Sequence, residues 1–127
     1  MTDRLKQMYS LQYDSQKLLE ELFPGAACIS GMEEQEQEEK FIKMLMLMIK
    51  EGTEVLDEIN YKPHIYNNKT IDRDALLEEL IDVLKYWFNL CILFGFTDAE
   101  IFEKFKSKTD KIITKFEQQA KLRDENV

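Results

Sequence analysis

Between Lys50 and Asp82 the sequence reads KEGTEVLDEINYKPHIYNNKTIDRDALLEELID. It holds two acidic motifs, Glu51-x-x-Glu54 and Glu79-x-x-Asp82, each with helical spacing. Residues three apart share a helix face, so each motif can aim both of its carboxylates at one point. Four carboxylates that converge from two helices need a cation, and oxygen ligands alone suit Mg²⁺ before Mn²⁺ or Ca²⁺. The stretch therefore predicts two helices with a metal site between them.

The alternative is that both motifs lie on solvated helix faces. Asp and Glu make up 25 of the 127 residues, so such pairs arise readily by chance. Apolar residues run into the first motif and interleave with the second: Met44, Leu45, Leu47, Met48 and Ile49, then Leu80, Ile81, Val83 and Leu84. Charges set into apolar stretches tend to be partly buried, and buried carboxylates are paired or bound to metal. This context favours the metal site over the solvated face.

Length and cysteine content bound the class of protein. A chain of 127 residues is expected to form one domain over residues 1–127 and to bury roughly two-thirds of its unfolded surface. Cys28 and Cys91 lack CxxC spacing, which is typical of small core residues in a reducing compartment. No apolar run reaches the ~20 residues of a membrane span, and the N-terminus lacks a signal-peptide pattern. We expect a cytoplasmic protein with no membrane partner.

Charge and residue usage narrow the partners and the fold. The net charge of −8 argues against a nucleic-acid binder, because phosphate backbones are neutralised by clustered Lys and Arg. A small anionic substrate remains compatible if a metal bridges it to the carboxylates. Only four Gly and two Pro occur, and strand-like alternation is nearly absent. The composition predicts an all-α chain, a bundle of four to five helices.

Local signals place four helices. They are expected from about Asp3 to Phe23, from the acidic run 33–39 to about Asn60, from after Asp72 to Phe94, and from Thr97 to about Arg123. Pro24-Gly25 breaks the first helix, and Gly95 ends the third. Asp72 is a good N-cap, and Thr97-Asp98-Ala99-Glu100 forms a capping box.

The second helix predicts an oligomer. Its stretch from Phe41 to Ile49 is apolar on nearly every side, so it is buried by its own chain or by a second subunit. The third helix adds further large apolar residues: Trp87, Phe88, Ile92, Leu93 and Phe94. Four short helices cannot easily hide this much apolar surface. We expect a homodimer or homotetramer in which the second and third helices form the interface and complete the bundle.

Several polar residues are candidates for binding a substrate. The loop 61–70 interleaves Tyr61, Lys62 and His64, either as a clamp for a base and its phosphates or as a surface loop that covers the core. His64, the only histidine, is a weak basis for a catalytic role. Gln12 lies inside the apolar stripe of the first helix, either satisfied locally at the core edge or aimed into a pocket.

The third and fourth helices carry further candidates. Tyr86 and Asn89 continue the stripe of the second acidic motif, at seven and ten residues after Glu79. In the fourth helix, Lys108 and Lys111 belong to a dense basic cluster with Lys104, Lys106 and Lys115. Such a cluster is usually a solvated face, and here it can also meet phosphate charge.

The combination of motifs resembles one family. Two acidic motifs separated by 24 residues, on a chain of about four helices, resemble the all-α nucleoside triphosphate pyrophosphohydrolases, which include MazG-like proteins and dimeric dUTPases. The resemblance covers roughly residues 41–111. Tyr61-Lys62-Pro63-His64 is similar to the aromatic and basic loop of dUTPase-like members, and Lys85-Tyr86 stands where dUTPases often carry His-Phe.

The resemblance implies hydrolysis of a nucleoside triphosphate, dUTP first among the candidates, to the monophosphate and pyrophosphate. It assigns Mg²⁺ to Glu51, Glu54, Glu79 and Asp82, with Glu51 and Glu54 as the catalytic pair. Two departures stand out: Lys50 replaces an additional Glu of many members, and a later motif matches at Phe105 and Lys108 but has Ile112 near the expected Asn.

Two other functions compete with this one. A house-cleaning pyrophosphohydrolase of broad specificity would stack any base against its aromatic rings and would form no base-specific hydrogen bonds. A non-enzymatic helical module would bind a partner helix through its apolar faces, with the acids only solubilising the chain. A di-iron bundle is disfavoured because it needs Glu-x-x-His pairs, which this chain lacks.

Overall fold

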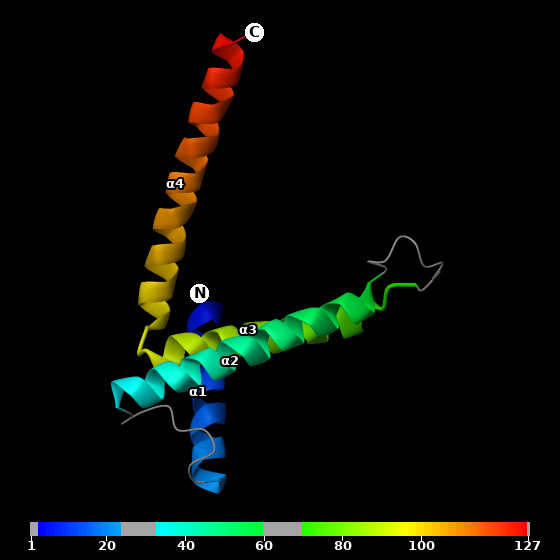
Figure 1. The fold of residues 1–127 in the computed structure, drawn as a ribbon, viewed down its shortest axis with the longest axis vertical. Coiled ribbons are helices and arrows are strands. Elements are labelled where there is room, and N and C mark those ends of the chain that lie inside the picture. The colour runs from blue at the N-terminus through cyan, green and yellow to red at the C-terminus, as the bar shows by residue number, and fades with distance from the viewer. Residues whose placement is uncertain (1–2, 24–32, 60–69, 127) are drawn as a thin grey trace. The chain divides into compact units, whose positions relative to one another are not determined.

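The computed structural model describes residues 3–23, 33–59 and 70–126. These residues are all-helical, with no strand among them, which confirms the predicted all-α class. Figure 1 shows the elements in order: α1 (Arg4–Leu22), α2 (Glu34–Val55), a short 3-10 turn η1 (Leu56–Glu58), α3 (Arg73–Leu93) and α4 (Asp98–Glu125).

Side-chain caps set where three helices begin. Asp3 accepts a hydrogen bond from the backbone N–H of Lys6 at 3.0 Å. Asp72 accepts from two backbone N–H groups of the first turn of α3, both at 3.1 Å. Thr97 accepts from Glu100 at 3.2 Å, as a capping box requires. The predicted starts at Asp72 and Thr97 are therefore confirmed. Gly95 follows α3 with φ +74°, the left-handed conformation that favours glycine after a helix.

The second helix ends earlier than predicted. Its regular part stops at Val55 instead of Asn60, tightens into η1, and reaches an extended backbone at Ile59. Such 3-10 turns are frequent at helix ends, where the last carbonyls have no partner within the α-helix.

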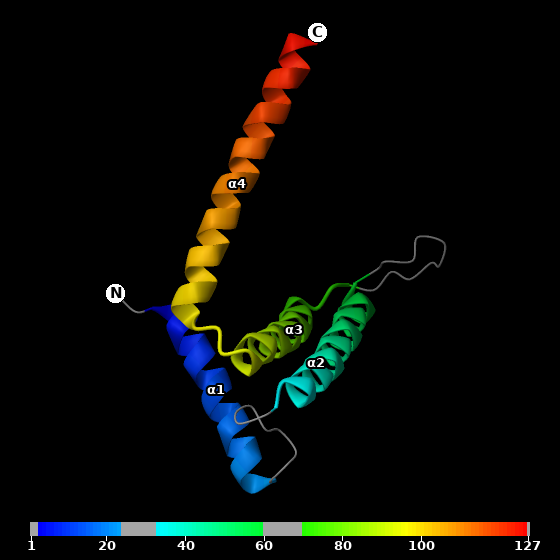
Figure 2. The same ribbon diagram turned by 60° about the vertical axis from the view of Figure 1, so that its left-hand side comes forward.

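The chain divides into two compact units, Met1–Gly95 and Phe96–Val127. In the first unit α2 and α3 lie side by side, as Figures 1 and 2 both show. They run antiparallel, because Gln37 in the first turn of α2 donates to the carbonyl oxygen of Leu93 at the end of α3 at 2.6 Å, whereas Glu51 near the end of α2 lies beside Glu79 in the first half of α3. That a single domain spans residues 1–127 stays a prediction.

Two small clusters form the core of the first unit. Between α2 and α3, Met44, Leu90 and Leu93 are buried, with Phe41, Leu45 and Met48 packed against them. Between α1 and α3, Phe88 and Ile92 are buried, with Leu5, Tyr9 and Leu84 around them. Cys91 is also buried, and burial raises the pKa of its thiol. This fits the core role predicted for Cys91, whereas Cys28 lies outside the described residues.

Part of the apolar stretch of α2 is not covered by the described residues of its own unit. Met44 is the one buried residue of the helix, whereas Ile42, Met46 and Ile49 are exposed by 58%, 66% and 58%. The stretch from Phe41 to Ile49 was expected to be buried either by its own chain or by a second subunit, and the described residues of the first unit do not bury all of it.

The second unit consists of α4. None of its described residues is buried. No single described helix is long and apolar enough to cross a membrane, and α3 and α4 meet that test of length and composition only when they are counted together.

Candidate metal site

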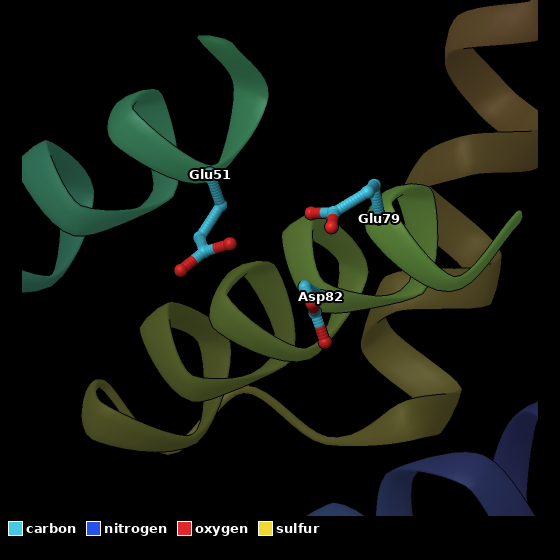
Figure 3. A group of neighbouring side chains, drawn as sticks. All are labelled: Glu51, Glu79 and Asp82. Carbon is cyan, nitrogen blue, oxygen red and sulfur yellow. The ribbon is translucent and has the colours of Figure 1, made fainter. Parts of the chain in front are cut away.

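Three of the four predicted metal ligands meet between α2 and α3. Each of Glu51, Glu79 and Asp82 offers a carboxylate oxygen, and these oxygens lie within 4.8 Å of one another. In Figure 3, Glu51 reaches from α2 toward α3, where Glu79 and Asp82 stand one turn apart. The antiparallel pairing of the two helices brings together motifs that are separated by 24 residues in the sequence.

Glu79 contributes a buried carboxylate oxygen to this cluster. Its side chain is half-buried, and its Oε2 is buried without a hydrogen-bond partner among the described residues. Burial raises the pKa of the Glu79 carboxyl, and the negative charges of Glu54, Asp82, Glu58 and Glu78 raise it further. A buried oxygen without a partner is costly, so a cation in this position would satisfy it.

Glu54 joins the cluster through Glu51. A hydrogen bond with the Glu54 side chain is the largest cause that raises the pKa of the Glu51 carboxyl. Desolvation and the charges of Glu54, Asp82 and Glu79 act in the same direction. The neighbouring carboxylates make ionisation of Glu51 less favourable, and a cation would offset this cost.

The cluster opens to solvent on the side of Asp82. Glu51, Glu54 and Glu79 are half-buried, whereas Asp82 is exposed. The partial burial predicted for the motifs therefore holds for three of the four carboxylates. A cation held here would keep a solvent-facing side, which a substrate anion or water can occupy.

Sequence reasoning missed Glu58. This residue lies in η1, is half-buried, and raises the pKa of Glu79 through its charge. The signal was present, because Glu51, Glu54 and Glu58 follow one another at i, i+3 and i+7 and so share a helix face.

The stripe of α3 that begins with Glu79 and Asp82 meets α2 at one end and α1 at the other. Its acidic end faces α2. At its other end Asn89 is 5% exposed, and its Oδ1 accepts a hydrogen bond of 2.7 Å from Nε2 of Gln12 on α1. Lys85 donates to Oε1 of the same Gln12 at 3.4 Å. Gln12 is therefore hydrogen-bonded within the core, by partners on α3 and not locally at the core edge. Tyr86 lies between the two ends and is half-buried.

The remaining substrate-binding candidates lie in the second unit or outside the described residues. Lys108 and Lys111 are exposed on α4, which belongs to the second unit. Tyr61, Lys62 and His64 lie outside the described residues. No protein-family model, curated protein or solved structure matches the chain.

Proposed function

We propose that this protein is a Mg²⁺-dependent nucleoside triphosphate pyrophosphohydrolase. It would hydrolyse a (deoxy)nucleoside triphosphate, with dUTP as the first candidate, to the monophosphate and pyrophosphate. The observation that carries the proposal is the cluster of Glu51, Glu79 and Asp82, whose oxygens lie within 4.8 Å of one another from two helices. The motif resemblance to the all-α pyrophosphohydrolases supplies the reaction and the substrate class.

The donor set fits a hard divalent cation. Every candidate ligand is a carboxylate oxygen, the donor that Mg²⁺ and Mn²⁺ prefer over nitrogen or sulfur. The partnerless Oε2 of Glu79 and the raised pKa values of Glu51 and Glu79 indicate negative charge without compensation. Glu51, Glu79 and Asp82 would hold the ion, with Glu54 beside them.

Bound Mg²⁺ supplies charge neutralisation of the triphosphate and a more acidic water. The motif resemblance assigns the general base to Glu51 and Glu54, and the raised pKa of the Glu51 carboxyl supports proton uptake at this position. Phosphoryl chemistry depends on positioning and on neutralising charge, so a site without a nucleophilic Ser or Cys suffices.

An oligomer is part of the proposal. Ile42, Met46 and Ile49 form an exposed apolar stripe on α2, spaced by four and three residues. Packing this stripe against a second copy would remove it from water and complete the bundle, as a homodimer or homotetramer. Tyr61, Lys62, His64, Tyr86, Lys108 and Lys111 remain the candidates for the base and phosphates, while Gln12 and Asn89 are engaged with each other.

Pyrophosphate release from a panel of canonical and modified triphosphates with Mg²⁺ tests the function. Strong preference for dUTP supports the proposed substrate, and a flat profile supports the broad-specificity enzyme. No release from any triphosphate would return the helical binding module to first place.

The carboxylates are tested in the same assay. Glu51→Gln, Glu54→Gln, Glu79→Gln and Asp82→Asn should each lower turnover at least about a hundredfold, because each removes charge that the transition state needs. Glu38→Gln, the same change at an exposed residue of α2, is the matched control. Wild-type turnover in the four site variants would show that the metal assignment is wrong.

A further inference from the structure

The apolar side of α4 has no partner within its own unit. Its stripe consists of five large residues, exposed by 46–74%: Phe102, Phe105, Ile112, Ile113 and Phe116. No other described element belongs to this unit. Amphipathic helices owe most of their stability in proteins to packing of the apolar face, so the stripe calls for an apolar partner.

The one polar side chain within the stripe is compatible with burial. Thr109 lies between Phe105 and Ile112 on this face, and its hydroxyl donates to the carbonyl oxygen of Phe105 at 2.9 Å. The hydroxyl is satisfied by its own helix, so its burial would leave no donor unpaired.

Opposite charges line the two edges of the stripe. Successive residues of a helix are 100° apart around its axis. With this spacing, one edge of the stripe carries four lysines: Lys104, Lys108, Lys111 and Lys115. The other edge carries three acids at intervals of seven residues: Glu103, Asp110 and Glu117. Lys106 and Lys121 are the exceptions on the acidic edge. Residues 96–127 carry seven Lys or Arg and seven Asp or Glu, so this unit is neutral but its signs are segregated.

We propose that α4 pairs with α4 of a second copy, side by side and parallel. When two identical helices pack through one stripe around a two-fold axis parallel to them, the left edge of one meets the right edge of the other. Each lysine edge then faces the partner's acidic edge. In the antiparallel arrangement each edge meets its own equivalent, so lysines would face lysines and acids would face acids.

The charge of the first unit makes it a poorer partner. Residues 1–95 carry 10 Lys or Arg and 18 Asp or Glu, a net charge of −8. A surface with an excess of negative charge attracts the lysine edge of α4 but repels its acidic edge. A second α4 satisfies both edges together, and it does so whether or not the chain binds Mg²⁺.

Disulfide trapping in the full-length chain tests the pairing. In a parallel two-fold pair each stripe residue lies opposite its own copy, so Phe102→Cys and Phe116→Cys should each form a covalent dimer on mild oxidation. Ser107→Cys is the matched control, because Ser107 is exposed on the opposite side of α4. Wild type reports any linking through Cys28 and Cys91.

Covalent dimer in the Phe102→Cys sample no higher than in the Ser107→Cys sample would overturn the proposal. If a covalent dimer formed only when the Phe102→Cys and Phe116→Cys variants were mixed, the helices would be antiparallel, and the proposal would also be overturned.

A charge reversal leaves the apolar stripe intact and tests the edges. Lys108→Glu with Lys115→Glu should raise the dissociation constant of the α4 pairing at least about tenfold, because both edges become repulsive. Adding Glu103→Lys, Asp110→Lys and Glu117→Lys should restore it. Lys6→Glu with Lys17→Glu changes the net charge equally on α1 and should have no such effect. Failure of the second set to restore association would contradict the parallel arrangement.

Discussion

Glu79 is a residue of the cluster whose ionisation the fold disfavours. Its Oε2 is buried without a hydrogen-bond partner among the described residues. Desolvation is the largest cause that raises the pKa of the Glu79 carboxyl, and the charges of four neighbouring acids raise that pKa further. The ionised carboxylate is therefore a cost to the folded protein at neutral pH unless a cation offsets it. In the proposed metal site, this residue would link the stability of the fold to metal binding.

We predict that Glu79→Gln raises the Tm of the metal-free protein at pH 7. The substitution removes a charge that the fold disfavours while keeping the size of the side chain. The same variant should lose most of the increase in Tm that Mg²⁺ produces in the wild type. Thermal unfolding with EDTA and with excess Mg²⁺ measures both effects, and Glu38→Gln is the control. A variant that melts below wild type in EDTA would show that Glu79 stabilises the fold by itself.

The pH dependence has a definite sign. The pKa values of Glu51 and Glu79 are raised above their ordinary value of 4.5. In the metal-free protein, the stability these groups contribute is fully present below that value and is lost as pH rises through the raised pKa values. A cation binds the ionised carboxylates, so protons compete with it. The increase in Tm caused by Mg²⁺ should be largest at neutral pH and shrink as pH falls through the raised pKa values. An increase that stays constant from pH 7 to below 4.5 would argue against binding at these carboxylates.

At the scale of elements, one polar pair ties α1 to α3. Gln12 and Asn89 are each 5% exposed and share a hydrogen bond of 2.7 Å among the apolar contacts of Phe88 and Ile92. A buried amide tolerates few positions of its partner, so the pair sets the register in which α1 packs. Lys85, which donates to Gln12 from the turn before Asn89, strengthens this contact.

Breaking the pair from one side should therefore be costly. Gln12→Ala or Asn89→Ala should each destabilise the protein by about 1–3 kcal/mol, because the remaining buried amide loses its partner. The double variant should lose less than the sum of the two, since it leaves neither amide unpaired. Urea unfolding of the four proteins gives the coupling, with Gln7→Ala, an exposed glutamine of α1, as the control. Strict additivity would mean that the hydrogen bond contributes nothing.

At the scale of the whole molecule, the exposed apolar residues of α2 predict self-association. Sedimentation at micromolar concentration should give a mass of at least twice the 15.1 kDa chain. Met46→Asp should lower that mass, because Met46 lies at the centre of the exposed stripe and a buried charge opposes association. Ser15→Asp, at an exposed position of α1, should leave the mass unchanged. A wild-type chain that sediments as a monomer would contradict the predicted interface.

Much of the secondary structure could be predicted from the sequence, because its signals are local. Asp72 and Thr97 cap the helices they were expected to cap, and Gly95 has the positive φ expected after a helix. These features depend on hydrogen bonds between residues two to four apart. The end of α2 was wrong by five residues, because no comparably specific signal marks Val55 as its last residue.

The candidate site depended partly on tertiary structure. Helical spacing alone paired Glu51 with Glu54 and Glu79 with Asp82, but only the antiparallel packing of α2 on α3 brought Glu51 within reach of the second motif. The same packing added Glu58 to the environment of Glu79, and the packing of α1 directed Asn89 to Gln12. The physical reason is range: caps and periodicity act within a few residues, whereas the convergence of carboxylates depends on which helix faces are buried against each other.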